Sequence, residues 1–573
     1  MKRLFSYLKR SQKAIGIGTL IKIVGTMMDL FIPYVLAHLL DNVVPTKNST
    51  LVLIWGGAMI LFSLFAFLFN VIANRMASLV ACDTTRDIRH DLFEKTSYLS
   101  SSQTDAFTIA SLESRLTSDT YNVNHMIGMS LRLGIRAPIL LIGGIVMTAI
   151  LDLRLTVVML LTLPFVYFAV RRASVAGIPL YKLLQKKNDE FTRVVREDAT
   201  GIRVIKALSK VPNEKDRFDI ANRDAIAVEK KAGMTMARLG PITTFVLNVG
   251  MCAVILAGGF LVTKDLTTSG TIIAFMSYFT IIANALINIS RIFVNVSKGS
   301  ASMARIDEVL SAEYELTYEG ELPEGEKNAP YIEFRHVFFS YGKHRVLEDI
   351  SFTLNRHETL GIIGETGAGK STLLNLLMRF YDADAGKIFL EGVNIREIPT
   401  KYLRQKFGVV FQNDFLFADT IKENIRFGRE CVSDADIENA ATYAQAKEFI
   451  EGRPDGYLDE LAIKGANLSG GQKQRTLIAR ALAADPDILI LDDSSSALDY
   501  KTDALLRASL AAHFSSTTSI VVSQRISSIA TANKIIVLSK GKILAIGKHE
   551  ELLSSCPTYA EINESQMGGA ILD

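Results

Sequence analysis

Cysteine is scarce in this sequence. The chain has 573 residues but only four cysteines, Cys82, Cys252, Cys431 and Cys556. None of them belongs to a CxxC pair or has a histidine at ligand spacing, so neither a zinc site nor a disulfide framework is indicated. We expect ordinary thiols, reduced or buried.

Strong net charge is also missing. The 63 lysines and arginines nearly balance the 60 aspartates and glutamates, which leaves a formal net charge of +3. Proteins that bind nucleic acid usually carry a basic excess, so we expect no nucleic-acid partner. The first apolar run has no small-residue cleavage site and is followed by another apolar run, which argues against a cleaved signal peptide.

Apolar residues, by contrast, are abundant. They make up 49 % of the chain, and the mean hydropathy is +0.23. A chain of 573 residues is also too long for one hydrophobic core. We therefore expect at least two domains, one of them in a membrane.

The first half predicts an α-helical membrane domain over residues 1–305. Long apolar runs with few charges are typical of helices that cross a bilayer. We place six spans near residues 14–40, 50–74, 132–151, 155–172, 240–263 and 266–290. Basic residues gather at the ends that we assign to the cytoplasm, in line with the positive-inside rule. Both termini are then cytoplasmic, in a multi-pass protein of the plasma membrane.

The charged residues near the start of the chain lead to three further predictions. Residues 1–13 alternate basic and apolar side chains, which favours a helix in the membrane interface, with a solvated basic tail as the alternative. Within the first span, we expect Lys22 to snorkel to the headgroups. Asp29 lies deeper, where an ionised carboxylate is costly unless it faces protein or water.

Asp29 is therefore the best pointer to a substrate cavity, one that would favour cations. A role in helix packing, or a carboxylate that snorkels to the headgroups, is the alternative. On the sixth span, Phe275, Tyr278 and Asn284 could line the same path, although aromatic residues at helical spacing more often pack in a core.

Two polar excursions interrupt the apolar runs, over residues 75–136 and 172–238. Each is far longer than an ordinary connection, so we expect continuous helical extensions into the cytoplasm. We place their tips around Leu112–Thr120 and Ile202–Pro212. After the last span, residues 306–330 read as a linker with turn-forming residues. From residue 331 to 573, β-rich runs alternate with helical segments, which predicts an α/β domain.

The first motif of this second domain that points to chemistry is a phosphate-binding loop. The run Leu360–Thr372 contains an apolar strand, then the pattern GxxxxGKS, then the start of a helix. Backbone amides from Gly367 to Ser371 can wrap phosphates at the helix N-terminus, Lys370 can reach the β and γ groups, and the Ser371 hydroxyl can bind Mg²⁺. The flanking strand and helix make this pattern specific.

A second apolar strand ends in two acids. Ile488–Leu491 has four consecutive apolar residues, as expected of a parallel strand covered on both faces. Asp492 and Asp493 follow it, and so emerge at the carboxyl edge of the sheet, where ligands bind in open parallel sheets. An acid there is well placed to hold Mg²⁺.

With these motifs, the chain resembles a half-transporter of the ATP-binding cassette (ABC) exporter type. The motif Leu468-Ser-Gly-Gly-Gln472 matches the signature of that family without a change. The resemblance implies a multidomain fold, in which a type I exporter-like, six-helix transmembrane domain precedes an α/β P-loop nucleotide-binding domain. It also implies ATP and Mg²⁺ as cofactors, membrane lipid as surroundings, and a small-molecule substrate.

The resemblance assigns roles to individual residues. It implies that Tyr341 stacks on adenine, that Gln412 senses Mg²⁺ and the attacking water, that Asp492 coordinates the metal, and that Asp499 acts across a dimer. Further positions implied to bind nucleotide are Gly364, Thr366, Gly367, Gly369, Lys370, Ser371, Thr372, Ser469, Gly471 and Gln472; those implied to hold the metal are Ser371, Gln412 and Asp492. The signature of such a domain contacts the γ-phosphate held by the opposite subunit.

Three positions depart from the family pattern. Asp493 stands where the family usually has a glutamate as general base, and its carboxylate is one methylene short of the attacking water. Gln524 replaces a histidine; it can hydrogen-bond a γ-phosphate but cannot carry a proton. Ile463 stands where exporters usually have a glutamate, which weakens the carry-over of a contact with the membrane domain.

Two changes at one γ-phosphate indicate a site that binds ATP well and hydrolyses it slowly. This pairing resembles one member of a bacterial heterodimeric multidrug exporter, and a heterodimer is favoured over a homodimer. The alternatives are a lipid or peptide exporter subunit, and a regulatory, ATP-gated membrane subunit that pumps nothing itself.

Overall fold

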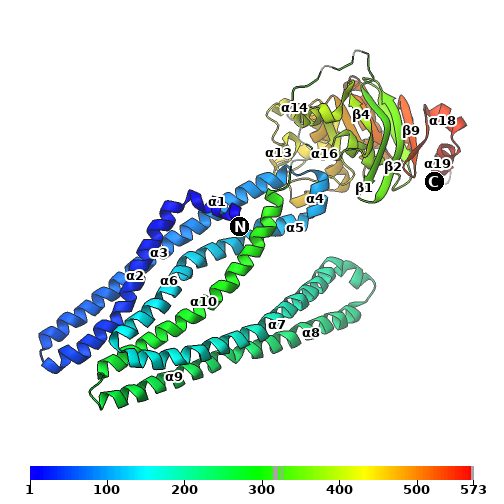
Figure 1. The fold of residues 1–573 in the computed structure, drawn as a ribbon. Helices are drawn as coiled ribbons and strands as arrows, with labels where there is room; N and C mark the ends of the chain where they lie inside the picture. Colours follow the sequence, from blue (N-terminus) through cyan, green and yellow to red (C-terminus); the bar gives the residue numbers. More distant parts are fainter. Residues whose placement is uncertain (314–315, 317–319, 324, 327, 569–573) are drawn as a thin grey trace. The chain divides into compact units, whose positions relative to one another are not determined.

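The computed structural model divides the chain into two compact units (Figure 1). The first unit contains Met1–Ser97 and Ile109–Ala312, and the second contains Tyr98–Thr108 and Glu313–Asp573. The structure describes residues 1–313, 316, 320–323, 325–326 and 328–568. Seven of the 25 residues of the expected linker (306–330) therefore lie outside the described residues.

The first unit is entirely helical in its described part. Its α-helices are α1 (Lys2–Arg10), α2 (Gln12–His38), α3 (Ser49–Ser97), α5 (Ile109–Ser114), α6 (Thr120–Leu151), α7 (Leu153–Ala207), α8 (Val211–Ala237), α9 (Leu239–Val262) and α10 (Ser269–Leu310). Short π or 3-10 segments are η1 (Leu39–Val43), η2 (Val44–Thr46) and η3 (Arg115–Asp119). Helix α2 lies along α3, α6 along α10, and α7 along α8 and α9 (Figure 1).

Several of these helices are much longer than a bilayer is thick. Helix α7 has 55 residues, which corresponds to about 80 Å at the α-helical rise, against roughly 30 Å of hydrocarbon. The expected helical extension is therefore confirmed for residues 172–238, whereas residues 75–136 are divided among α3, α4 (Ser101–Phe107), α5, η3 and α6. Asp152 separates α6 from α7 and caps α7, because its carboxylate accepts from the backbone N–H groups of Arg154 and Leu155.

Only one of the two expected tips is where the sequence predicts it. The chain turns between α7 and α8 at residues 208–210, inside the predicted range. The predicted place of the first tip was wrong: α3 already ends at Ser97, and the predicted range 112–120 is helical. Residues 98–108, with α4 (Ser101–Phe107), belong to the second unit. Polarity alone does not show which unit a short helix packs against.

Five helical segments of the described chain are long and apolar enough to cross a membrane. They are Gln12–Thr46, Ser49–Ser97, Ile109–Leu151, Thr244–Val262 and Ser269–Leu310. The expected span 155–172 lies in α7, where the shorter apolar segment Leu153–Thr162 is described. The count of six spans thus stays a prediction. Helix α10 continues to Leu310, so the expected linker begins as helix.

The second unit contains two sheets. A four-stranded antiparallel sheet has the order β2-β1-β4-β5, and a six-stranded sheet has the order β10-β9-β3-β8-β7-β6. The strands are β1 (Ile332–Tyr341), β2 (His344–Leu354), β3 (Thr359–Gly364), β4 (Ala385–Leu390), β5 (Val393–Asn394), β6 (Phe407–Val410), β7 (Ile488–Asp492), β8 (Thr518–Val522), β9 (Lys534–Ser539) and β10 (Lys542–Gly547). Apart from the antiparallel edge strand β10, the larger sheet is parallel.

Helices of the second unit pack on this parallel sheet, as a sheet with covered faces requires. Besides α4, the helices of this unit are α11 (Lys370–Leu377), α12 (Thr400–Gln405), α13 (Ile421–Arg426), α14 (Asp434–Tyr443), α15 (Lys447–Glu451), α16 (Gly470–Leu482), α17 (Tyr500–His513), α18 (His549–Ser555) and α19 (Pro557–Gly568). Among those that pack on the sheet are α11, α12, α16 and α18. Short 3-10 segments are η4 (Ile395–Glu397), η5 (Gly456–Leu458), η6 (Ile463–Gly465) and η7 (Ile526–Ser528). The predicted strand at 488–491 is β7, every residue of which is buried.

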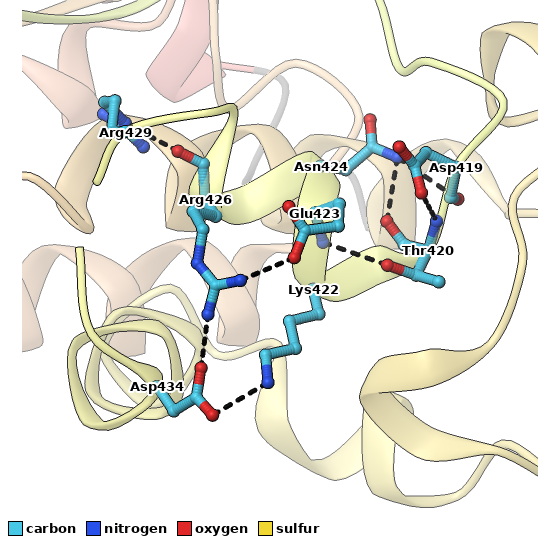
Figure 2. A network of polar contacts seen from close by, with 8 residues as sticks. All are labelled: Asp419, Thr420, Lys422, Glu423, Asn424, Arg426, Arg429 and Asp434. Carbon is cyan, nitrogen blue, oxygen red and sulfur yellow. Dashed lines mark hydrogen bonds and ion pairs between the residues drawn. The ribbon is translucent and has the colours of Figure 1, made fainter. Parts of the chain in front are cut away.

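A buried amide holds the turn before α13 (Figure 2). Asn424 is only 1 % exposed. Its Oδ1 accepts from the N–H of Phe417 at 2.9 Å and from Arg480 at 3.0 Å, and its Nδ2 donates to the carbonyls of Phe417 and Thr420 at 3.0 Å each. Asp434, by contrast, lies on the surface, with its side chain 63 % exposed. Its carboxylate accepts hydrogen bonds from the Lys422 ammonium and the Arg426 guanidinium.

Replacing Asn424 with alanine should therefore destabilise the second unit by about 3 kcal/mol, since several buried backbone and side-chain groups lose their partner. Asp434→Ala is the matched control and should change stability little, because exposed ion pairs contribute little. Pulse proteolysis in urea on the purified full chain measures both. Similar losses for the two variants would contradict the assignment of the turn's stability to Asn424.

Candidate nucleotide site

The phosphate loop connects β3 to α11. Gly367 and Gly369 have φ angles of +83° and +98°, a region that side chains with a Cβ rarely adopt, and they turn the chain directly into the helix. Gly364 ends β3. The Lys370 ammonium folds back onto the loop and donates to the carbonyls of Gly364 and Glu365 at 2.7 and 2.8 Å. The Lys370 ammonium thus lies at the phosphate loop itself, where it can reach a phosphate group held by the loop.

The expected metal ligands meet across the sheet. Strands β3 and β7 both neighbour β8 in the parallel sheet, so the residues after them emerge at one edge. The Ser371 hydroxyl donates to Asp492 Oδ2 at 2.7 Å. Asp492 is only 4 % exposed; burial raises the pKa of its carboxyl, while the bond from Ser371 and the charge of Lys370 oppose that rise.

Asp493 follows β7 in a left-handed backbone conformation, with φ of +49°. Its N–H donates to the Val522 carbonyl at 2.9 Å, which anchors the residue to the end of β8. Burial raises the pKa of its carboxyl, against the charges of Lys370 and Arg525. Burial in turn lowers the pKa of the Lys370 ammonium, against the attraction of the two carboxylates.

These groups line one pocket of about 240 Å³. Of the predicted site residues, those that line it are Thr366, Gly367, Gly369, Lys370, Ser371, Thr372, Gln412, Asp492, Asp493 and Gln524. Val346, Val522 and Ser523 also line it and were missed by the sequence reasoning. Ser523 follows the apolar strand β8, so the rule that placed Asp492 at the carboxyl edge could have found it too.

Tyr341 lies elsewhere. It ends β1 and is 37 % exposed. Its ring makes edge contacts with Phe339 and Tyr381, at centroid distances of 4.8 and 5.2 Å. Together with Asp105 of α4, these aromatic residues line a second pocket, and the Tyr381 hydroxyl donates to Asp105 at 2.6 Å. The structure therefore does not bring Tyr341 into the phosphate pocket, and its adenine role stays a prediction.

The signature residues also lie outside the phosphate pocket of the described chain. Ser469 caps α16 by a capping box with Gln472: its Oγ accepts from the Gln472 N–H at 3.3 Å, and Gln472 Oε1 accepts from the Ser469 N–H at 3.0 Å. A Cβ on Gly471 would lie 3.3 Å from the carbonyl oxygen of Ala497. The signature thus packs beside the loop that leads to Asp499.

Asp499 is a helix cap as well. Its Oδ1 accepts from the Thr502 N–H at 2.9 Å and its Oδ2 from the Thr502 hydroxyl at 2.8 Å. These hydrogen bonds hold the pKa of its carboxyl below the ordinary value. Asp499 and Ser469 are therefore held at two helix N-termini, and neither is among the residues that line this chain's own phosphate pocket.

The residues of the pocket fit a Mg²⁺–nucleotide complex. Hard cations bind oxygen donors and bridge protein to substrate phosphates, and the Ser371 hydroxyl and the Asp492 carboxylate offer two such donors 2.7 Å apart. Lys370 supplies a cation, and the start of α11 supplies backbone N–H groups with a favourable dipole for an anion.

Comparison with protein-family models agrees with this division. Residues 15–286 match the ABC transporter transmembrane region, and residues 347–496 match the ABC transporter domain. The chain is 34 % identical, over 570 residues and 99 % of both chains, to the "Uncharacterized ABC transporter ATP-binding protein YfiB" of Bacillus subtilis. It is also 32 % identical to Rv1273c of Mycobacterium tuberculosis, likewise called an ABC transporter ATP-binding protein, over 98 % of this chain and 97 % of the relative.

A solved structure is similar over nearly the whole length. The ATP-bound structure of a bacterial Atm1-family ABC exporter matches with a TM-score of 0.82 and 25 % identity, over 97 % of this chain and 98 % of the other. The chain belongs to the ABC transporter family, as an exporter half-transporter in which a membrane-embedded region precedes the nucleotide-binding domain. The domain implies ATP binding, normally with Mg²⁺, and an ATPase coupled to transport. Half-transporters of this type work as dimers.

Proposed function

We propose that this chain is the degenerate-site subunit of a heterodimeric exporter. The observation that carries the proposal is the composition of one pocket: Asp493 and Gln524 line it together with Lys370 and Asp492. Binding groups are present, whereas the two groups that would take or hold a proton near the γ-phosphate are replaced. Such a site binds ATP and hydrolyses it slowly.

The backbone supports the reading of Asp493. Its N–H is tied to Val522, so the short side chain cannot compensate for its missing methylene by a free shift of the main chain. A general base must lie within hydrogen-bond reach of the water it deprotonates. An aspartate held in this way remains short of a water that a glutamate would reach.

The signature motif, unlike the positions of Asp493 and Gln524, is unaltered from the family pattern. Ser469, Gly470 and Gly471 keep the family residues, and the capping box holds them in order. In the proposed dimer they complete the competent site of the partner chain, while Asp499 acts across the interface. ATP closes the two nucleotide-binding domains, and hydrolysis in the partner's site reopens them.

The remaining assignments follow from this proposal. Residues 1–305 form the transmembrane domain with six spans and both termini in the cytoplasm, residues 306–330 the linker, and residues 331–573 the nucleotide-binding domain. Tyr341 and the pocket residues bind ATP, and Ser371, Gln412 and Asp492 hold Mg²⁺. The cargo is a hydrophobic or amphipathic compound, in the manner of multidrug exporters, moved by alternating access across the plasma membrane.

Transport by inverted vesicles tests the proposal. The chain is expressed alone, and with a second half-transporter that has glutamate and histidine at the positions equivalent to 493 and 524. ATP-dependent accumulation of an amphipathic dye should appear only with both chains, and it should vanish when the partner's glutamate is changed to glutamine. Nucleotide binding without accumulation in either preparation would instead favour a regulatory, ATP-gated subunit, which the altered pocket also suits.

A further inference from the structure

A further cavity lies in the first unit, the helical one, between α2, α6 and α10. Its volume is about 460 Å³, enough for a small organic molecule. The polar residues that line it are Asp29, Arg136, Ser277, Asn284 and Asn288. The rest of the lining is apolar, with Ile32, Leu133, Leu140 and Ile281 among it. A ligand for this cavity therefore needs both an apolar body and a polar group.

Not every residue expected on this path reaches it. Asn284 does, but Phe275 and Tyr278 are fully buried in the helical core. The Tyr278 hydroxyl donates to the Leu30 carbonyl, close to Pro33, where the helix lacks one backbone donor. The two aromatic residues thus join α10 to its neighbours, and the polar amides face the cavity.

An ion pair forms the charged end of the cavity. Arg136 Nη2 donates to Asp29 Oδ2 at 2.9 Å, and the two side chains are 37 % and 24 % exposed. Charges at this depth are costly unless they face a cavity or a partner, and this pair does both. Asn70 also donates to the same carboxylate oxygen, at 3.4 Å.

The surroundings of the pair are cationic. Lys22 lies within electrostatic range of both its members, and Arg132 is in range of Lys22. Lys22 does not snorkel as expected: it is 2 % exposed and donates to Asn74 Oδ1 at 2.9 Å. Arg132 donates to the Gly128 carbonyl and to the Ser78 hydroxyl. Lys22 and Arg132 are therefore held by neutral acceptors, and Arg136 is the cation that pairs with Asp29.

Arg136 also has unused donor capacity. Its Nε is buried and has no hydrogen-bond partner among the described residues. A guanidinium offers five donors and no acceptor, and it binds carboxylates and phosphates in a bidentate manner. Nε lies too deep for a ligand to reach, but the side chain is 37 % exposed and lines the cavity, so an anion in the cavity can approach the guanidinium donors that Asp29 leaves unused.

We propose that this cavity binds an amphipathic anion, with the carboxylate or phosphate group at Arg136 and the apolar body between α2, α6 and α10. This substrate class rests on the proposed exporter function. It reverses the expectation of a cation site at Asp29, because that carboxylate is already neutralised and the neighbouring charges are positive. A lipid and a small amphiphile both offer this chemistry, an anionic group joined to an apolar body.

Ligand binding without ATP tests this proposal separately from transport. The full chain with its partner is placed in phosphatidylcholine nanodiscs. Fluorescence anisotropy then compares a nitrobenzoxadiazole-labelled dodecanoic acid with the matched dodecyl trimethylammonium probe. The acid should bind about tenfold more tightly or better, and Arg136→Gln should remove this preference. Arg136→Lys should retain part of it. Arg154→Gln, at the α6–α7 hairpin, is the matched control and should change nothing.

Asp29→Asn provides a second, independent test in case Arg136→Gln folds poorly. With its carboxylate gone, Arg136 is free, so affinity for the acid should rise severalfold; a cation site would instead lose the ammonium probe. Equal binding of the two probes, or weaker binding of the acid in Asp29→Asn, would overturn the proposal. Phosphatidylglycerol in the disc should displace the acid if the natural ligand is a lipid, and should leave it bound if it is a small amphiphile. Loss of vesicle transport with this binding intact would count against the exporter function alone.

Discussion

Alanine in place of Ser469 should lower the ATPase rate of the two-chain complex about 100-fold, whereas Asp493→Asn should lower it less than about twofold. Loss of one donor to a developing phosphate charge costs on the order of 10²–10³ in rate, and we place Ser469 at the partner's working site. In the proposed dimer, Asp493 belongs to a site that contributes little turnover, so its neutralisation should remove little activity. Steady-state phosphate release from the purified complex measures both variants.

A helix-cap control separates the catalytic effect from a folding effect. Ser433 begins α14 with the same type of capping box as Ser469, and it does not line the phosphate pocket described above. Ser433→Ala loses the cap alone, which costs about 1 kcal/mol of stability, and should leave the ATPase rate nearly unchanged. Equal ATPase losses from Ser469→Ala and Asp493→Asn would contradict the division of labour between the two sites.

The double variant Asp493→Glu with Gln524→His should turn this chain's own site into a working one. A well-placed general base contributes about 10²–10⁴ in rate, and a histidine can hold a proton where glutamine cannot. We expect single-turnover hydrolysis at this site to rise about 100-fold. The measurement uses a complex in which the partner's general base has been neutralised, so that the new activity is seen against a low background.

The left-handed backbone at residue 493 requires its own control. Asp485 has φ of +46° and is exposed at a loop, so Asp485→Glu introduces the same side chain in the same backbone region away from the pocket. That variant should be as stable as the parent and should gain no activity. If the double variant folds normally and still hydrolyses no faster, a feature other than the short carboxylate and the missing histidine limits this site.

Local patterns were sufficient for the phosphate site. The glycines, Lys370 and Ser371 act within one turn, and the apolar run before Asp492 defines a buried strand whose end must lie at the sheet's carboxyl edge. The family resemblance added Gln412 and Gln524, which follow other strands of the same sheet. Apart from Gly364, which ends β3, these residues line one pocket, because parallel strands bring their carboxyl ends together whatever separates them in the chain.

Tertiary packing decided what those patterns could not. The turn after α3 lies earlier than polarity predicts, because residues 98–108 pack with the second unit. Tyr341 faces Tyr381, far along the chain, instead of the phosphate loop.

By itself, then, the sequence determined the division into a membrane half and a nucleotide-binding half, and the phosphate loop, since each depends on residues close together in the chain. The resemblance to the family, rather than local spacing, singled out Asp493 and Gln524. The charge of the membrane cavity depended on which helices meet. Asp29 and Arg136 are separated by more than a hundred residues, so only the packing of α2 against α6 shows that the carboxylate is paired and that the cavity presents an arginine.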